Sequence, residues 1–171
     1  MASSPSLLFL ILSQTLFSLL AIGAAQSPEF LVGCYNTTVP TQVADPAGTA
    51  AATMMGCLSS HISSLVADTS QLAASAPHAA AAQAFSDCAH KLACVKSALG
   101  AAHAALAQDD YKGAGKSVHS ALDYGAECQS KIDAALKSGA GVVTAKVAAV
   151  QHKMKLLGEL CEAVINIVEH M

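Results

Sequence analysis

Cysteine and histidine side chains are the residues of this sequence whose types and spacing could do chemistry. The segment AFSDCAHKLACVKSAL, residues 84–99, carries Cys88 and Cys94 in an Ala-rich run that favours a helix. Their separation of six residues is not a whole number of 3.6-residue turns, so the two thiols point to different faces of that helix. Each thiol therefore needs its own explanation, and the two do not form an obvious redox or metal pair.

Catalytic and nucleic-acid-binding motifs are missing. The sequence contains no GxSxG elbow and no HExxH, and its glycines form no phosphate-binding loop. The paired acids Asp109 and Asp110 stand at a predicted helix start, where carboxylates cap exposed N–H groups and favour the helix dipole. The net charge is −3, with nine Lys and no Arg, so no basic patch is predicted. We therefore expect a protein that is not an enzyme and does not bind nucleic acid.

The N-terminus indicates secretion. Residues 1–25 form an apolar run without a charged side chain, and Gly23 and Ala25 give a small-x-small cleavage site. We interpret residues 1–25 as a signal peptide, and a single membrane anchor is the alternative because the run is nearly long enough to span. The mature chain, 26–171, is expected to be one extracellular domain without membrane contact. Asn36 lies in a glycosylation sequon, and the six Cys then indicate disulfides.

Periodicity predicts an all-α fold. Four segments carry apolar or small residues at an unbroken 3,4 spacing, which is the seam of a helix that packs on other helices. Short turn segments divide them, and short turns make neighbouring helices antiparallel. We therefore expect an up-down-up-down antiparallel four-helix bundle over 51–171, preceded by a Pro-containing N-terminal extension over 26–50. The predicted seams run from Met55 to Leu72, from Phe85 to Leu106, from Tyr111 to Ala135 and from Val143 to Val168.

Equal distances from a turn place two cysteines at the same height. Cys88 and Cys128 are equally far from the turn near residue 108 and both occupy seam positions, so the sequence predicts a disulfide between them. The other pairings stay open. Turning about residue 76 makes Cys57 level with Cys94, whereas the competing scheme joins Cys34 to Cys57. That second scheme leaves Cys94 with Cys161 or free.

The same count creates a possible zinc site. His61 is level with His90, and with Cys57 and Cys94 they form a two-thiolate, two-imidazole set. An oxidising compartment favours disulfides over zinc thiolates, and His90 falls at an outward helix position. We therefore predict two surface histidines beside a disulfide, and neither a metal nor another cofactor.

Four segments of the chain resemble the plant invertase and pectin methylesterase inhibitor family. The segment CYNTTVP resembles the family's opening Cys and Thr-rich segment, and AFSDCAHKLACVKSAL resembles its Asp-Cys helix start. ALAQDDYKGAGKSVHSALDYGAEC is similar to its acidic-Tyr turn leading to the next Cys, and LLGELCEAVINIV to its last helix. Two features depart from the family. The second Cys expected near Val43 is missing, and the turn reads QDDYKG where invertase inhibitors have Pro-Lys-Phe.

The resemblance implies a function as well as a fold. It implies a four-helix bundle behind a short α-hairpin, without catalysis, that covers the active-site cleft of an apoplastic or cell-wall enzyme. The QDDYKG turn favours pectin methylesterase as the target, with a cell-wall or vacuolar invertase as the alternative. Asp109, Asp110, Tyr111 and Lys112 are candidate target contacts; a capped turn with Tyr111 packed inward is the other interpretation. From another class, a small-ligand carrier or structural wall protein remains an alternative.

Overall fold

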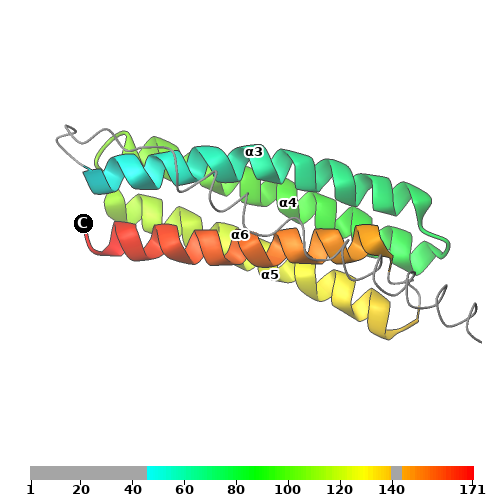
Figure 1. The fold of residues 1–171 in the computed structure, drawn as a ribbon. Helices are drawn as coiled ribbons and strands as arrows, with labels where there is room; N and C mark the ends of the chain where they lie inside the picture. The colour runs from blue at the N-terminus through cyan, green and yellow to red at the C-terminus, as the bar shows by residue number, and fades with distance from the viewer. Residues whose placement is uncertain (1–45, 140–143) are drawn as a thin grey trace, which may run out of the picture. The chain divides into compact units, whose positions relative to one another are not determined.

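The structure is a computed structural model that describes residues 46–139 and 144–171. Four α-helices make up almost all of this part of the chain (Figure 1). They are α3 (Pro46–Ser75), α4 (Ala79–Leu106), α5 (Tyr111–Lys137) and α6 (Ala145–Glu169). The predicted signal peptide (1–25), Asn36 and Cys34 lie outside the described residues, so the predictions made for them stay predictions.

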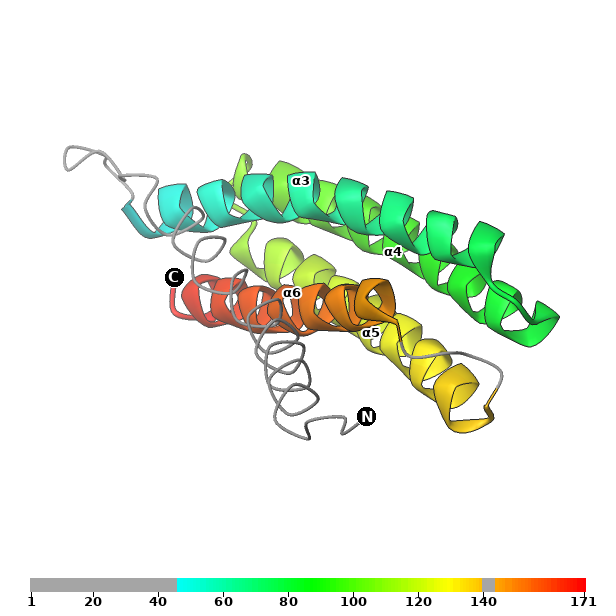
Figure 2. The same ribbon diagram turned by 45° about the vertical axis from the view of Figure 1, so that its right-hand side comes forward.

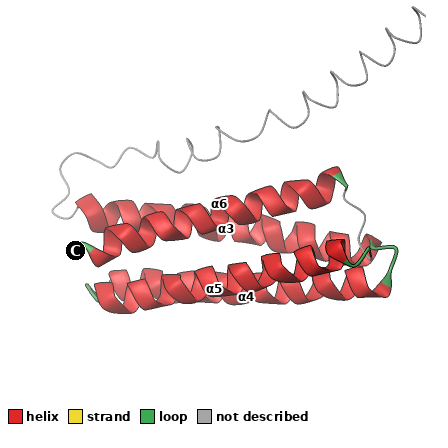
Figure 3. Cartoon of the chain, turned by 90° about the horizontal axis from the view of Figure 1, so that it is seen from below, coloured by secondary structure: helices red, strands yellow, loops and turns green. Residues whose placement is uncertain are grey.

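The four helices pack into one bundle in which each helix contacts two neighbours. Each helix packs against the one before it, and α6 packs against α3. α3 lies beside α4 and α5 beside α6 in two different views (Figures 1 and 2). Within the described residues there are helices and loops but no strand (Figure 3). The predicted all-α, up-down-up-down bundle is confirmed.

The turns fall in the segments that the sequence indicates, and each has a local cause. Pro77 stands between α3 and α4, where Pro suits the start of the following helix. Asp110 and Thr144 are the N-cap residues of α5 and α6. Gly139, just past the end of α5, has a φ of 73°, the left-handed conformation with which glycine often ends a helix.

The core consists of the predicted seams. Every described seam residue of α3 and α6 is buried. The seams of α4 and α5 are also buried, except for Leu106 and Tyr111. These two residues are half-buried beside the α4–α5 turn. Thr69 is a fully buried polar residue among them, and its hydroxyl donates to the carbonyl of Leu65. Because Tyr111 is only half-buried, the inward position expected for it is only partly realised.

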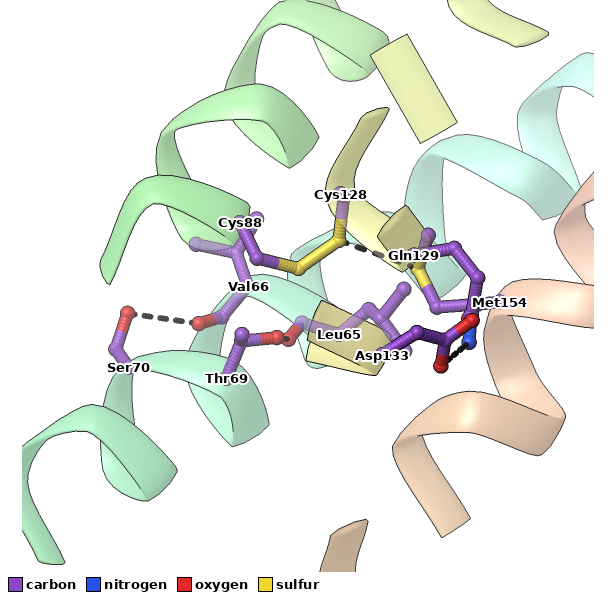
Figure 4. Close-up of a disulfide and its surroundings, with 9 residues drawn as sticks. All are labelled: Leu65, Val66, Thr69, Ser70, Cys88, Cys128, Gln129, Asp133 and Met154. Atoms are coloured by element: carbon purple, nitrogen blue, oxygen red, sulfur yellow. Dashed lines mark hydrogen bonds between the residues drawn. A yellow bond between two sulfur atoms is a disulfide. The ribbon is translucent and has the colours of Figure 1, made fainter. Parts of the chain in front are cut away.

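A disulfide joins Cys88 of α4 to Cys128 of α5, with their Cα atoms 4.3 Å apart (Figure 4). Both residues are completely buried. Sγ of Cys128 lies 3.7 Å from Sδ of Met154 on α6; neither sulfur carries a hydrogen, so this is a packing contact. The disulfide-stabilised bundle that the sequence predicts is confirmed, and its bridge lies in the core.

The first bundle helix begins earlier than expected. The predicted boundary between extension and bundle, at 50 and 51, falls inside α3, which starts at Pro46. Proline fixes φ near the helical value, and the N–H that it lacks has no partner in the first turn of a helix. Pro46, which falls in the expected extension, therefore begins the first bundle helix.

Length and composition alone would let one helix of the described chain, Ala47–Ser75, cross a membrane. In the bundle, the apolar seam of this helix packs against α4 and α6. Asp68 on the same helix pairs with Lys153 of α6, Oδ2 to Nζ at 2.7 Å. Core packing thus accounts for the seam residues of this helix.

Candidate functional site

The turn between α4 and α5 carries the four predicted contact residues. Oδ1 of Asp110 accepts the N–H of Gly113 at 2.9 Å and so caps α5. Asp109 has a φ of 57°, and its Oδ1 accepts a hydrogen bond from the Tyr111 hydroxyl at 3.3 Å. Lys112 is exposed. Two acids and a tyrosine therefore hold the turn together, and their contact with a target stays a prediction.

Gly113 leaves the space that the capping carboxylate of Asp110 occupies. A Cβ at this position would stand 2.1 Å from Oδ2 of Asp110, which is far inside the contact distance of two atoms. Any other residue would push the Asp110 carboxylate away from the first turn of α5. The aspartate cap of α5 thus depends on both residues.

A shallow groove runs along the surface between α4 and α5. We call it the α4–α5 groove; its volume is about 320 Å³. Small or hydroxyl-bearing side chains line most of it, so the groove presents several hydroxyl groups. The lining residues are Cys94, Ser97, Ala98, Ala101, Ser117, Ser120 and Tyr124.

A ladder of charges continues the groove along the same two helices. Lys91 pairs with Glu127, and its Nζ lies 5.4 Å from the centre of the Tyr124 ring. Asp87 and Lys131 form the next pair, Oδ2 to Nζ at 3.8 Å. The hydrogen bond to Glu127 raises the pKa of the Lys91 ammonium, against the opposite effect of burial. Lys91 therefore stays protonated between a carboxylate and an aromatic ring.

The remaining cysteines exclude two of the pairings that the sequence left open. Cys94 and Cys161 are free thiols, so Cys57–Cys94 and Cys94–Cys161 are both wrong. Cys57 is itself disulfide-bonded, and none of the other described cysteines is its partner. Cys161 is buried, and this burial raises the pKa of its thiol to about 12. Cys94 is exposed in the α4–α5 groove.

The direction in which Cys94 points explains why the Cys57–Cys94 pairing is wrong. The flank of α4 that meets α3 is marked by Lys96, whose Nζ donates to Oγ of Ser63 at 3.1 Å. Cys94 lies on the other flank, beside Ser117 and Ser120 of α5. Counting from a turn gives the height of a residue in the bundle, but a pairing also needs the right rotation about the helix axis.

The possible zinc set is not assembled. Cys57 is held in a disulfide and cannot supply a thiolate, and His90 is exposed as predicted. Among residues 46–139 and 144–171, no three His, Cys, Asp or Glu side chains are placed to share a metal ion. His61 is half-buried, and burial together with the positive charge of Lys153 lowers its pKa below 6.5.

The charge ladder was not recognised from the sequence, although a signal for it exists. The count that makes Cys88 level with Cys128 also places Lys91 close to Glu127 and Asp87 close to Lys131 in height. Opposite charges at equal heights on antiparallel neighbours predict cross-helix pairs. Only the rotation of the side chains, which the structure supplies, distinguishes these pairs from chance alignments.

The fold and surface together define a class of protein, the all-α bundle braced by a disulfide. The described chain is a disulfide-braced antiparallel four-helix bundle with a small-residue groove and a charge ladder between α4 and α5. The described residues show no gathered metal ligands. Such a surface is suited to contact with another molecule.

Comparison with known proteins supports this fold. No family model and no curated protein sequence matches the chain. Among solved structures, the chain is similar to a pectin methylesterase inhibitor from Arabidopsis thaliana, with a TM-score of 0.64 and 18% sequence identity. The match covers 84% of this chain and 96% of that chain. At this identity the similarity establishes a shared all-α fold.

Proposed function

We propose that this protein is a secreted inhibitor of a pectin methylesterase. The observation that carries the proposal is the similarity of fold to a pectin methylesterase inhibitor over nearly the whole length of that chain. The family resemblance of the segments around Cys88 and Cys128 supports it independently, and the disulfide joins these two segments. The sequence contains no catalytic motif that would favour an enzyme instead.

The surface between α4 and α5 is the face that covers the target's active-site cleft in this proposal. Protein interfaces of standard size bury about 800 Å² per partner and depend on a few anchor residues, often aromatic. Tyr124 and Lys91 are such residues, and the α4–α5 groove beside them receives a projecting side chain of the target. Asp109 and Lys112 extend the face around the turn.

An inhibition assay tests the proposal. The mature protein is incubated with pectin methylesterase, and methanol release from pectin is measured; cell-wall and vacuolar invertases are assayed in parallel. We expect loss of the esterase activity at micromolar inhibitor and no effect on either invertase. Inhibition of an invertase alone would mean that the invertase is the target instead. Inhibition of neither enzyme would refute the proposal.

A matched pair of variants tests whether the surface between α4 and α5 contacts the target. Ser120→Arg places a long cation in the α4–α5 groove, whereas Ser130→Arg makes the same change at an exposed position of α5 outside that groove. We expect Ser120→Arg to weaken inhibition by at least about tenfold, because steric exclusion at an interface commonly costs more than 1.4 kcal/mol. Equal inhibition by the two variants would move the contact surface elsewhere.

The proposal extends to the N-terminal part of the mature chain. Residues 26–171 form a single inhibitor domain in which Cys34 pairs with Cys57. Cys34 is the cysteine that remains once the other pairs and free thiols are assigned. Peptide mass mapping without reduction should yield one peptide that contains Cys34 and Cys57. A Cys34 peptide that alkylates without reduction would contradict this pairing.

A further inference from the structure

A second groove lies on another side of the bundle, between α5 and α6. We call it the α5–α6 groove; its volume is about 450 Å³, within the range of small-molecule sites. Its larger apolar side chains are Leu122 of α5 and Met154 and Leu157 of α6, of which Met154 and Leu157 are core residues only 5% and 4% exposed. Small residues complete it: Ala121, Gly125, Ala126 and Gly158.

Two glycines keep this groove open although close packing does not require them. A Cβ at Gly125 would lie 3.7 Å from Cδ2 of Leu157, and one at Gly158 would lie 3.9 Å from Cδ1 of Leu122. Both are ordinary contact distances, so alanine would fit at either site. A helix is less stable with glycine than with alanine at an interior position. Contact between the two helices therefore does not explain why glycine stands at these positions.

Polar groups stand at one end of the groove and on its rim. Gln129 and Gln151 both donate to Oδ1 of Asp133, at 2.8 and 2.9 Å, and close that end. Lys155 is the ionisable residue of the lining. Its Nζ lies 3.7 Å from Oε1 of Glu159, and both side chains are largely exposed. Such a pair is weak, so the ammonium is available to a ligand anion.

We propose that the α5–α6 groove binds a single-chain aliphatic carboxylate, with the chain over Leu122, Met154 and Leu157 and the carboxylate on Lys155. The apolar lining selects the chain, and the single cation on the rim selects an anionic head. An apolar pocket with a few convergent polar groups is the usual form of a small-ligand site. The groove shares no residue with the α4–α5 groove, so this proposal goes beyond the inhibitor function and does not depend on it.

Calorimetric titration of the mature protein with dodecanoate and with dodecan-1-ol tests the proposal. We expect the carboxylate to bind more tightly than the alcohol. Lys155→Gln should weaken dodecanoate binding by about fivefold, the size of an exposed ion pair, and leave the alcohol unchanged. Equal affinities for the two ligands, or no response to Lys155→Gln, would overturn the assignment of the head group.

A groove-filling variant with a matched control locates the site. Gly158→Leu puts a side chain into the α5–α6 groove, and Gly100→Leu adds the same side chain to α4 where a Cβ meets nothing within 4 Å. Gly158→Leu should abolish binding and Gly100→Leu should not, with circular dichroism confirming that both variants are folded. Unchanged binding by folded Gly158→Leu would overturn the proposal.

Two other occupants of the groove are outcomes of the same experiment. If a second copy of the chain fills it, light scattering will show a dimer of the natural protein that Gly158→Leu dissociates. If residues 26–45 of the same chain fill it, the natural protein will bind neither ligand. Either result would overturn the proposal.

Discussion

The disulfide between Cys88 and Cys128 is predicted to supply a large part of the stability of the bundle. The bridge closes a loop with a sequence separation of 40 residues. On the chain-entropy model, such a loop destabilises the unfolded state by about 4 kcal/mol. Both cysteines are also buried, and the Cys128 sulfur packs against Met154, so replacing both with alanine removes packing worth roughly 1 kcal/mol more. A domain of this size is commonly stable by about 5–15 kcal/mol, so the loss approaches the limit of folding.

Urea unfolding followed by circular dichroism measures this loss. With an m-value of about 2 kcal/mol/M, the double variant Cys88→Ala, Cys128→Ala should unfold at a midpoint about 2.5 M lower. Cys94→Ala is the matched control because that thiol is exposed and unbonded, and its effect should stay within about 0.5 kcal/mol. A loss below about 1 kcal/mol in the double variant would refute the reasoning, because it would mean that the bridge does not restrict the unfolded chain.

Three further predictions concern single side chains. Asp110→Ala removes the cap of α5 and should lower the free energy of unfolding by about 1 kcal/mol in urea titrations, whereas no change would show that the cap is dispensable. The pKa of His61 is lowered by burial and by Lys153, so the folded protein binds fewer protons than the unfolded chain, and stability should fall as the pH drops below 6.5. Unfolding curves above and below that pH should show a smaller fall for His61→Gln, and an unchanged fall would exclude this residue as a cause. A maleimide at neutral pH should label Cys94 in the folded protein and leave Cys161, whose thiol is buried with its pKa raised to about 12, until the protein unfolds; mass spectrometry of the labelled peptides distinguishes the two.

Most of the fold follows from the sequence because one physical signal dominates it. Large apolar residues recur at helical spacing through each segment, and Leu92, Ile132 and Val164 are accordingly fully buried. The turns could be placed because glycine, proline and capping aspartate act locally. Cys88 and Cys128 could be paired because both occupy seam positions, where height along the bundle and direction toward the neighbour are known together.

Other features depend on rotation about a helix axis, which spacing fixes less well away from the seam. Cys94 is level with Cys57 but faces α5, so the Cys57–Cys94 alternative does not form. The α5–α6 groove was missed for a related reason. Gly125 keeps a seam position and Gly158 stands beside one, and a pattern of small residues does not show whether a neighbour fills the space that they leave.

The cross-links of the bundle are distributed unevenly, and this bears on its function. The buried disulfide and the two ion pairs of the charge ladder join α4 to α5. At the turn, the Asp110 cap and Gly113 fix how α5 begins. A surface that is already ordered loses less conformational entropy when it binds than a flexible one does. The α4–α5 pair is thus the part of the described chain best prepared to present a fixed face to a partner, as the proposed cleft-covering role would require.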